Sequence, residues 1–189
     1  MQESDLIALA ERIAGIGTEL PDVEVKAARE GCPKLFDSLS SLANKSGGGT
    51  ILFGLDEKAG FEACGVYSAS DLMTQVTNQC LQMEPILRPL FTTAEYRSVT
   101  LVSAEIPEIE YEKGPCFYRG KGRLSGAYVR VGDQDLHMTE YEVYSYEAFR
   151  KKIAYFMSRY LKPMIASGSI IMTIPDKPRS KFQKYCAKQ

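Results

Sequence analysis

A cluster of cations and aromatic rings lies between residues 113 and 132, where the sequence contains no acidic residue. The cations are Arg119, Lys121, Arg123 and Arg130, and the interleaved aromatic residues are Phe117, Tyr118 and Tyr128. Lysine and arginine neutralise phosphates, and aromatic faces stack on unpaired bases. The segment therefore indicates nucleic-acid binding, with a solvated hairpin loop whose tyrosines belong to the core as the alternative.

Three consecutive glycines, Gly47–Gly49, stand between a helical pattern and an apolar strand pattern. A phosphate-binding P-loop has the opposite order, with a strand, then glycines, then GK[ST] at the start of a helix. Here Lys45 precedes the glycines, which follow the negative end of the helix dipole. This order argues against an ATP loop. It favours a helix C-cap and tight turn, while an amide nest that contacts nucleic-acid phosphate is the alternative.

Cysteines and histidines are too few and too widely spaced to indicate a zinc centre. The five cysteines, at positions 32, 64, 80, 116 and 186, include no CxxC pair, and His137 is the single histidine. Zinc knuckles, thioredoxin-type sites and mechanisms with two imidazoles are therefore not supported. We expect no metal, no cofactor, and unpaired thiols of the kind found in the reducing cytoplasm.

The composition predicts a soluble protein with an uneven distribution of charge. Of the 189 residues, 44% are hydrophobic and 25% are charged, and no apolar stretch approaches the length of a membrane span. The N-terminal residues lack the basic region of a secretion signal, so we expect a cytoplasmic protein. Residues 151–189 hold nine Lys or Arg and one acid, whereas the remaining residues carry a net charge of −9. The basic segment either contacts phosphate or docks on the acidic body.

Hydrophobic periodicity predicts the elements that would position these residues. Helical spacing covers residues 4–14, a segment from Pro33 to the glycines, residues 70–83, and a long helix from a capping box at Thr139–Glu142 to about Leu161. Strand patterns cover 23–25, 50–55, 61–66, 97–106, 127–131 and 170–174. We expect an α+β fold with a mixed sheet and packed helices at residues 1–150, followed by a short basic helix and strand extension at residues 151–189.

Several motifs follow one another in a characteristic order along residues 5–150. They are Glu24–Lys26, the stretch Leu42–Asp56, Gly65-Val66, Tyr128–Gly132 and the helix start at Thr139. In order and spacing they resemble the Schlafen AlbA_2 DNA-binding domain family. The resemblance implies a protein that binds nucleic acid and acts in bacterial transcriptional regulation. It favours DNA over RNA as the target. The contacts expected under it are Lys26, Lys45, Gly47, Gly48, Gly49, Arg119, Lys121, Arg123 and Arg130.

The C-terminal extension carries a second resemblance. Residues 167–178 are similar to the end of the winged-helix domain in bacterial RecG-related ATP-dependent DNA helicase proteins. Those proteins place an ATPase-like region between the two parts, and the residues between Lys152 and Gly168 leave no room for one. The extension therefore resembles a winged-helix remnant, and we expect neither ATP hydrolysis nor helicase action.

Two other functions stay open at this point. Glu19, Glu24 and Asp56 match the carboxylate spacing of Schlafen-type ribonucleases, to which they are similar, and three carboxylates could hold a divalent metal for phosphodiester cleavage. Solvated acids at strand ends are the alternative. The acidic body would also suit a protein–protein interaction module without nucleic-acid binding. We further expect a homodimer, because the apolar strand at 170–174 would be an exposed edge unless it pairs with a partner chain or with the body's sheet.

Overall fold

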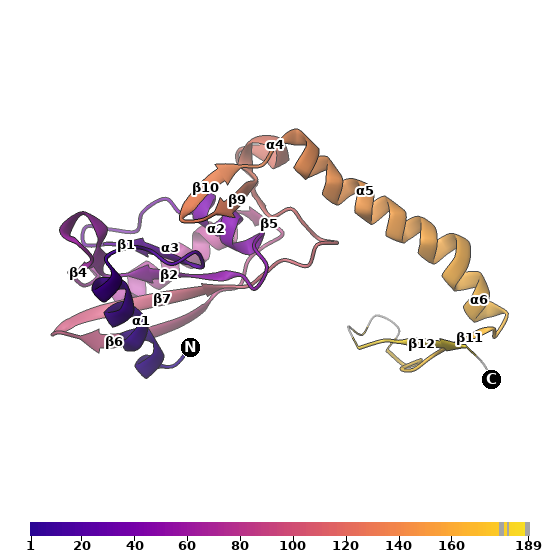
Figure 1. The fold of residues 1–189 in the computed structure, drawn as a ribbon, viewed down its shortest axis with the longest axis horizontal. Coiled ribbons are helices and arrows are strands. Elements are labelled where there is room, and N and C mark those ends of the chain that lie inside the picture. Colours follow the sequence, from indigo (N-terminus) through magenta and orange to yellow (C-terminus); the bar gives the residue numbers. More distant parts are fainter. Residues whose placement is uncertain (178–179, 181, 188–189) are drawn as a thin grey trace. The chain divides into compact units, whose positions relative to one another are not determined.

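A four-stranded mixed sheet forms the centre of the first part of the chain. Its strand order is β1 (Val23–Lys26), β2 (Gly49–Phe53), β7 (Val99–Ile106) and β6 (Leu90–Tyr96). β1 and β2 run parallel, and the other neighbours are antiparallel. The structure is a computed structural model that describes residues 1–177, 180 and 182–187, and Figure 1 shows its elements. The predicted α+β fold with a mixed sheet is confirmed.

Helices cover both faces of this sheet because successive side chains of the strands point into two different cores. α1 (Glu3–Ile16) packs its apolar stripe against the face that carries Leu52. α2 (Phe36–Ala43) and α3 (Ala69–Cys80) cover the opposite face, which carries Ile51 and Phe53. The alternation follows from the two-residue period of a strand. Burial on both faces explains why β2 is an almost continuous apolar run.

The apolar run predicted as one strand at 50–55 is divided by Gly54. β2 ends before this glycine, and β3 (Leu55–Asp56) pairs with β4 (Glu62–Ala63) around a 3₁₀ turn, η1 (Glu57–Ala59). Gly54 has a φ of +101°, and a Cβ atom there would lie 2.7 Å from Cδ2 of Leu101. A glycine is therefore required where the chain leaves the central sheet.

Shorter elements pack on the side of the sheet that α2 and α3 cover. β5 (Met83–Glu84) pairs with β8 (Phe117–Tyr118), and α4 (Gly122–Gly126) follows. β9 (Tyr128–Val131) and β10 (Gln134–His137) then form an antiparallel hairpin that contacts α2. The segment between 113 and 132, for which a solvated hairpin loop was the alternative, is therefore partly helical.

Polar side chains of α2 and its C-cap hold this hairpin in place. Ser40 Oγ donates to the carbonyl of Cys116 and accepts from the amide of Tyr128, both at 2.8 Å. Asn44 Nδ2 donates to the same two residues' carbonyls, at 2.9 and 3.0 Å, and its Oδ1 accepts from the Cys116 amide at 2.7 Å. The asparagine of the predicted glycine-rich stretch thus has a structural role.

Some predicted boundaries are corrected by the structure. The second helix begins at Phe36 and not at Pro33, and the sequence did not predict β6 or β10. The capping box is confirmed, since the Thr139 amide donates to Glu142 at 2.7 Å and the Glu142 amide donates to Thr139 Oγ1 at 3.2 Å. The long helix consists of α5 (Glu140–Phe156), a π-helical turn η2 (Met157–Leu161) and α6 (Lys162–Ala166).

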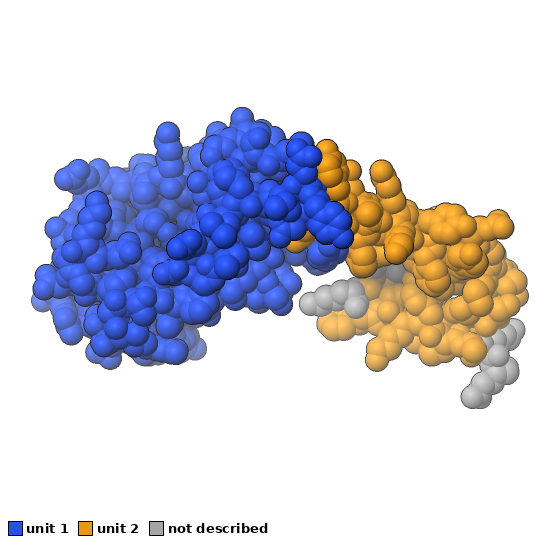
Figure 2. All heavy atoms as spheres, turned by 45° about the horizontal axis from the view of Figure 1, so that its top comes forward, with its two compact units in different colours: residues 1–143 blue, residues 144–189 orange. Residues whose placement is uncertain are grey.

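The chain forms two compact units, residues 1–143 and residues 144–189, which Figure 2 colours blue and orange. In the second unit, β11 (Ile170–Met172) pairs with β12 (Tyr185–Ala187). The strand predicted at 170–174 therefore pairs within its own unit. We had expected it to pair with a partner chain or with the body's sheet. The pairing within the unit weakens the edge-strand argument for a dimer. None of the described helices is long and apolar enough to cross a membrane.

Candidate nucleic-acid interface

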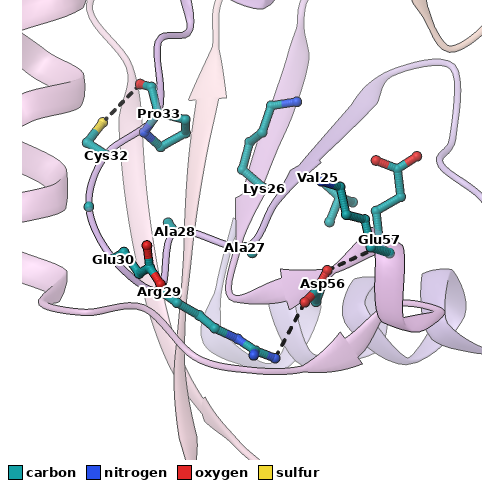
Figure 3. Close-up of a pocket in the computed structure, with 12 residues that line it drawn as sticks. Val25, Lys26, Ala27, Ala28, Arg29, Glu30, Cys32, Pro33, Asp56 and Glu57 are labelled. Atoms are coloured by element: carbon teal, nitrogen blue, oxygen red, sulfur yellow. Dashed lines mark hydrogen bonds and ion pairs between the residues drawn. The ribbon is translucent and has the colours of Figure 1, made fainter.

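A groove of about 730 Å³ opens where the two parallel strands of the sheet end (Figure 3). Its walls are residues 25–33, which include the end of β1, and residues 56–58, which follow β2 and lie at the end of β3. Three cations contribute to it from two distant segments: Lys26, Arg29 and Lys58. Ligand crevices commonly lie outside the carboxyl ends of parallel strands, so the topology makes this groove the first candidate site.

Carboxylates balance the cations of the groove. Arg29 extends toward Asp56, 3.6 Å away, as Figure 3 shows, and Lys26 pairs with Glu24. The Arg29 side chain is 53% exposed, so its pair is a weak surface interaction that a phosphate can replace. Cys32 also lines the groove, but burial raises the pKa of its thiol, which disfavours a nucleophilic thiolate.

Arg130 lies in the interior, although the sequence predicted it as a surface contact. Its side chain is 1% exposed and binds the carboxylates of Glu24, Glu19 at 3.1 Å and Asp135 at 3.0 Å. It also donates to the carbonyl of Val23 at 3.2 Å. A phosphate could reach this guanidinium only if the cluster were broken, so we leave Arg130 out of the interface.

The three carboxylates of the ribonuclease hypothesis do not form one group. Glu19 and Glu24 face Arg130, and Glu19 also accepts a hydrogen bond from the Val25 amide at 2.7 Å. Burial raises the pKa of Glu19. Asp56 lies apart from this cluster, at the wall of the groove. Within the part of the chain that the structure describes, no group of three His, Cys, Asp or Glu side chains could hold a metal ion.

The glycine turn after α2 uses two of its amides within the chain. Gly47 donates to Oε2 of Glu108 at 2.9 Å, and Gly48 donates to the carbonyl of Lys45 at 3.0 Å. Gly48 has a φ of +70°, and a Cβ atom there would lie 2.2 Å from the carbonyl oxygen of Ile106. The structure therefore shows the tight turn that the sequence favoured. A contact between these amides and phosphate stays a prediction.

The same turn lines a second hollow of about 610 Å³. Lys45 and the three glycines contribute to it, together with Arg88, which the sequence did not predict. Asp22 and Glu105 line it as well, and Glu108 already occupies the Gly47 amide. An anion would have to compete with these carboxylates, so this hollow is the weaker candidate.

The predicted cations between 119 and 123 are attached to neighbouring elements. Arg119 is exposed and donates to a carbonyl at the C-terminal end of α3. Lys121 Nζ lies 3.1 Å from Tyr128 Oη, and this hydrogen bond raises the pKa of the lysine. Arg123 is half-buried, with its guanidinium 5.4 Å from the ring centroid of Phe117. Arg119 and Lys121 therefore remain as surface cations.

Several cations of the site have no local signal in the sequence. Arg29 and Lys58 line the groove, and Lys34 lines a smaller hollow with Lys121. Arg29 and Lys58 are each next to an acid in the sequence, and only the fold brings them together. A positional signal did exist, because both residues follow predicted strands that could have been recognised as parallel neighbours.

Comparison with known families agrees with this fold. The model of the family described as Schlafen, AlbA_2 matches residues 19–139, so the chain belongs to the Schlafen AlbA_2 family, as its motifs predicted. A model of the C-terminal domain of Fic-like proteins (filamentation induced by cAMP) matches residues 147–186. The sequence analysis did not anticipate this second similarity. No curated protein matches the chain.

Two solved structures have a similar fold. One is the solution structure of the N-terminal domain of a Nitrosomonas europaea protein described as ATP-dependent DNA helicase RecG-related, with a TM-score of 0.55 and 22% identity over 71% of this chain and 93% of that one. The other is the crystal structure of the DIP2311 protein from Corynebacterium diphtheriae, with a TM-score of 0.50 and 17% identity over 76% of this chain and 28% of that one. At these identities the likeness concerns the fold alone.

Proposed function

We propose that this protein binds nucleic acid, with DNA as the favoured target over RNA, and acts as a transcriptional regulator. The observation that carries the proposal is a cationic rim, which we define as Arg29, Lys34, Lys58 and Lys121. All four side chains are exposed, and they come from segments that the fold brings to two adjoining hollows. The hollows adjoin along the chain because Pro33 lines the first and Lys34 lines the second. The family and the name of the RecG-related neighbour support the same function.

The charge of the protein limits the strength of this binding. Glu30, Asp56 and Glu57 also line the groove, and the residues before 151 carry a net charge of −9. Phosphate contacts of the rim must therefore compete with repulsion from the body. We expect a Kd in the micromolar range or weaker, as for electrostatic binding without base readout.

The expected result is a salt-dependent affinity set by the rim. If three or four phosphates are neutralised, the logarithm of the binding constant should fall against the logarithm of salt concentration with a slope of about −3. Replacing Arg29 and Lys58 by alanine should weaken binding and reduce this slope by about 0.7 to 0.9 for each lost contact. Fluorescence anisotropy with labelled single-stranded and duplex DNA and RNA measures both quantities.

A charge-matched control separates the rim from net charge. Arg12 in α1 and Lys113 after β7 are exposed and lie outside both hollows. Their double alanine variant changes the net charge equally and should bind like wild type. An equal loss in both double variants, or no binding by wild type at about 50 mM salt, would contradict the proposal.

We also propose a homodimer, now on the basis of exposed aromatic side chains on α5 instead of an exposed strand edge. Large apolar side chains of α5 are strongly exposed, with Tyr155 at 59% and Phe156 at 54%. Among the described residues of the second unit, Leu161 is the only buried one. A helix with this much exposed aromatic surface indicates a protein interface, and a second copy of the chain is the simplest partner.

Light scattering on the full chain tests the dimer. Replacing Tyr155 and Phe156 by serine should convert the protein from dimer to monomer, because it removes the apolar surface that the partner would bury. Replacing the exposed Lys151 and Lys152 by serine on the same helix should leave the dimer intact. A wild-type monomer at all concentrations would exclude the homodimer and leave these aromatic residues for a different protein.

A further inference from the structure

A smaller hollow of about 320 Å³ lies between the start of α2 and the turn that follows β8. Its lining residues come from two segments distant in sequence. They are Lys34, Phe36, Asp37, Tyr118 and Lys121. The combination of two cations with two aromatic rings distinguishes this hollow from the larger groove, which has no aromatic lining.

The two aromatic rings are already arranged as a stacking platform. The rings of Phe36 and Tyr118 are stacked, with centroids 3.8 Å apart and an interplanar angle of 14°. Both side chains are half-buried, and both pack against the core that includes Leu35 and Cys116. A Cβ atom on Gly120 would lie 2.4 Å from the Tyr118 ring, so a residue other than glycine at this position would displace the ring. The rings are therefore held in a fixed orientation before any ligand arrives.

The cations of the hollow lie beside these rings. Lys121 is held by Tyr128 at 3.1 Å and by Asp37 at 3.6 Å, and Lys34 is exposed. The single carboxylate, Asp37, is half-exposed and paired with Lys121, so the two cations outnumber it. A flat apolar surface flanked by ammonium groups suits a molecule that joins a planar ring to an anion.

The size of the hollow restricts the ligand further. A volume of about 320 Å³ is at the lower end of the range for small-molecule sites, and accommodates a single nucleotide unit. A base inside a duplex is covered by its neighbours and can reach an aromatic ring only after unstacking. A base that stacks in the hollow would therefore have to be unpaired.

We propose that this hollow binds one unpaired nucleotide of a single-stranded nucleic acid, with the base stacked on the Phe36–Tyr118 pair and the adjacent phosphates near Lys34 and Lys121. The inference rests on the proposed nucleic-acid binding and adds its substrate class. The neighbouring groove with Arg29 and Lys58 would then follow the backbone of the same strand. The protein should accordingly prefer single strands to duplex of equal length.

The test uses the full chain with labelled 12-nucleotide strands of thymidylate and uridylate and with a 12-base-pair duplex. Tyr118→Leu keeps an apolar side chain but removes the ring, and should weaken single-strand binding by about 5- to 150-fold. Duplex binding should change less than about twofold, and the salt slope should be unaltered, because no cation is removed. Tyr118→Phe keeps the ring and should bind single strands like wild type.

Two further measurements cover failure of that variant to fold. A strand that carries 2-aminopurine should lose fluorescence on binding the wild-type protein, as a stacked base does. Replacing the exposed Lys34 and Lys121 together by glutamine should reduce the single-strand salt slope by about 0.7 for each residue. Unlabelled mononucleotide should compete only weakly with the strand.

The outcomes distinguish the two proposals. If wild type binds nucleic acid but Tyr118→Leu retains its single-strand affinity within twofold, or 2-aminopurine is not quenched, the stacking site is wrong and nucleic-acid binding stands. If wild type binds neither strand nor duplex, both proposals fail. If the mononucleotide competes as effectively as the strand, the hollow is a site for a free nucleotide and the single-strand assignment is overturned.

Discussion

Replacing Arg130 by methionine is expected to lower the free energy of unfolding by about 3–5 kcal/mol. The guanidinium is buried and binds Glu19, Glu24 and Asp135. Methionine fills much of the same volume, but it leaves the carboxylates buried without their cation, and the cost of an uncompensated buried charge exceeds the cost of the lost contacts. Urea denaturation at pH 7 measures the change.

Two comparisons show whether the buried charge is the cause. Arg12→Met in α1 removes an exposed cation and should alter the free energy of unfolding by less than about 0.5 kcal/mol. Adding Glu19→Gln to Arg130→Met should recover part of the loss, because it neutralises a carboxylate that pairs with Arg130, whereas Glu24 also pairs with Lys26. A loss below about 1 kcal/mol for Arg130→Met would mean that water reaches the cluster and solvates the charges.

The pH dependence of this variant has a definite sign. Burial already raises the pKa of Glu19, and Arg130 is one of the groups that lower it. Without the guanidinium this pKa rises further above its value in the unfolded chain, so the folded state binds the proton more tightly. The destabilisation is then fully present above the folded-state pKa and is relieved as the pH falls through it. The defect of Arg130→Met should therefore be smaller at pH 5 than at pH 7.

For Arg130, the sequence predicted the strand but not the direction in which the side chain points. The AYVRV pattern correctly predicted β9, because alternation has the period of a strand. Alternation does not say which set of side chains faces inward. Here Tyr128 and Arg130 are buried while Val131 is 54% exposed, the reverse of what hydrophobicity favours. The inversion depends on Glu19, Glu24 and Asp135, whose convergence on one point is a property of the tertiary fold.

The central elements were predictable because local periodicity defines them. The site was not predictable, because its residues meet only in the tertiary fold. β2 and α1 are amphipathic or apolar over many residues, so local periodicity is sufficient to identify them. β6 was missed because it is an edge strand with mixed polarity. The cationic rim was missed in large part. Arg29 and Lys58 are distant in the sequence and line one groove because β1 and β2 are parallel neighbours, and Lys34 lines a hollow with the distant Lys121 only in the folded chain. Family motifs identified the fold, whereas the grouping of the surface cations could be seen only in the three-dimensional structure.

Replacing Gly48 by alanine is expected to lower the free energy of unfolding by about 3 kcal/mol. Its φ of +70° is unfavourable for an L-residue by about 1–2 kcal/mol, and the added Cβ atom would lie 2.2 Å from the carbonyl oxygen of Ile106. The contact is with backbone, which cannot rotate away as a side-chain tip can, so overpacking adds about 1–3 kcal/mol. Thermal or urea unfolding of the purified variant measures the sum.

Gly47→Ala provides the matched control, because the same substitution one residue earlier separates conformational strain from steric overlap. Gly47 has a φ of +82°, but no atom lies within 4 Å of the position of its Cβ, so the loss should be only about 1 kcal/mol. Both substitutions keep the backbone amides. If those amides contact phosphate, each variant should still bind nucleic acid at temperatures where it is folded. Equal destabilisation by the two variants would contradict the close approach of Gly48 to Ile106.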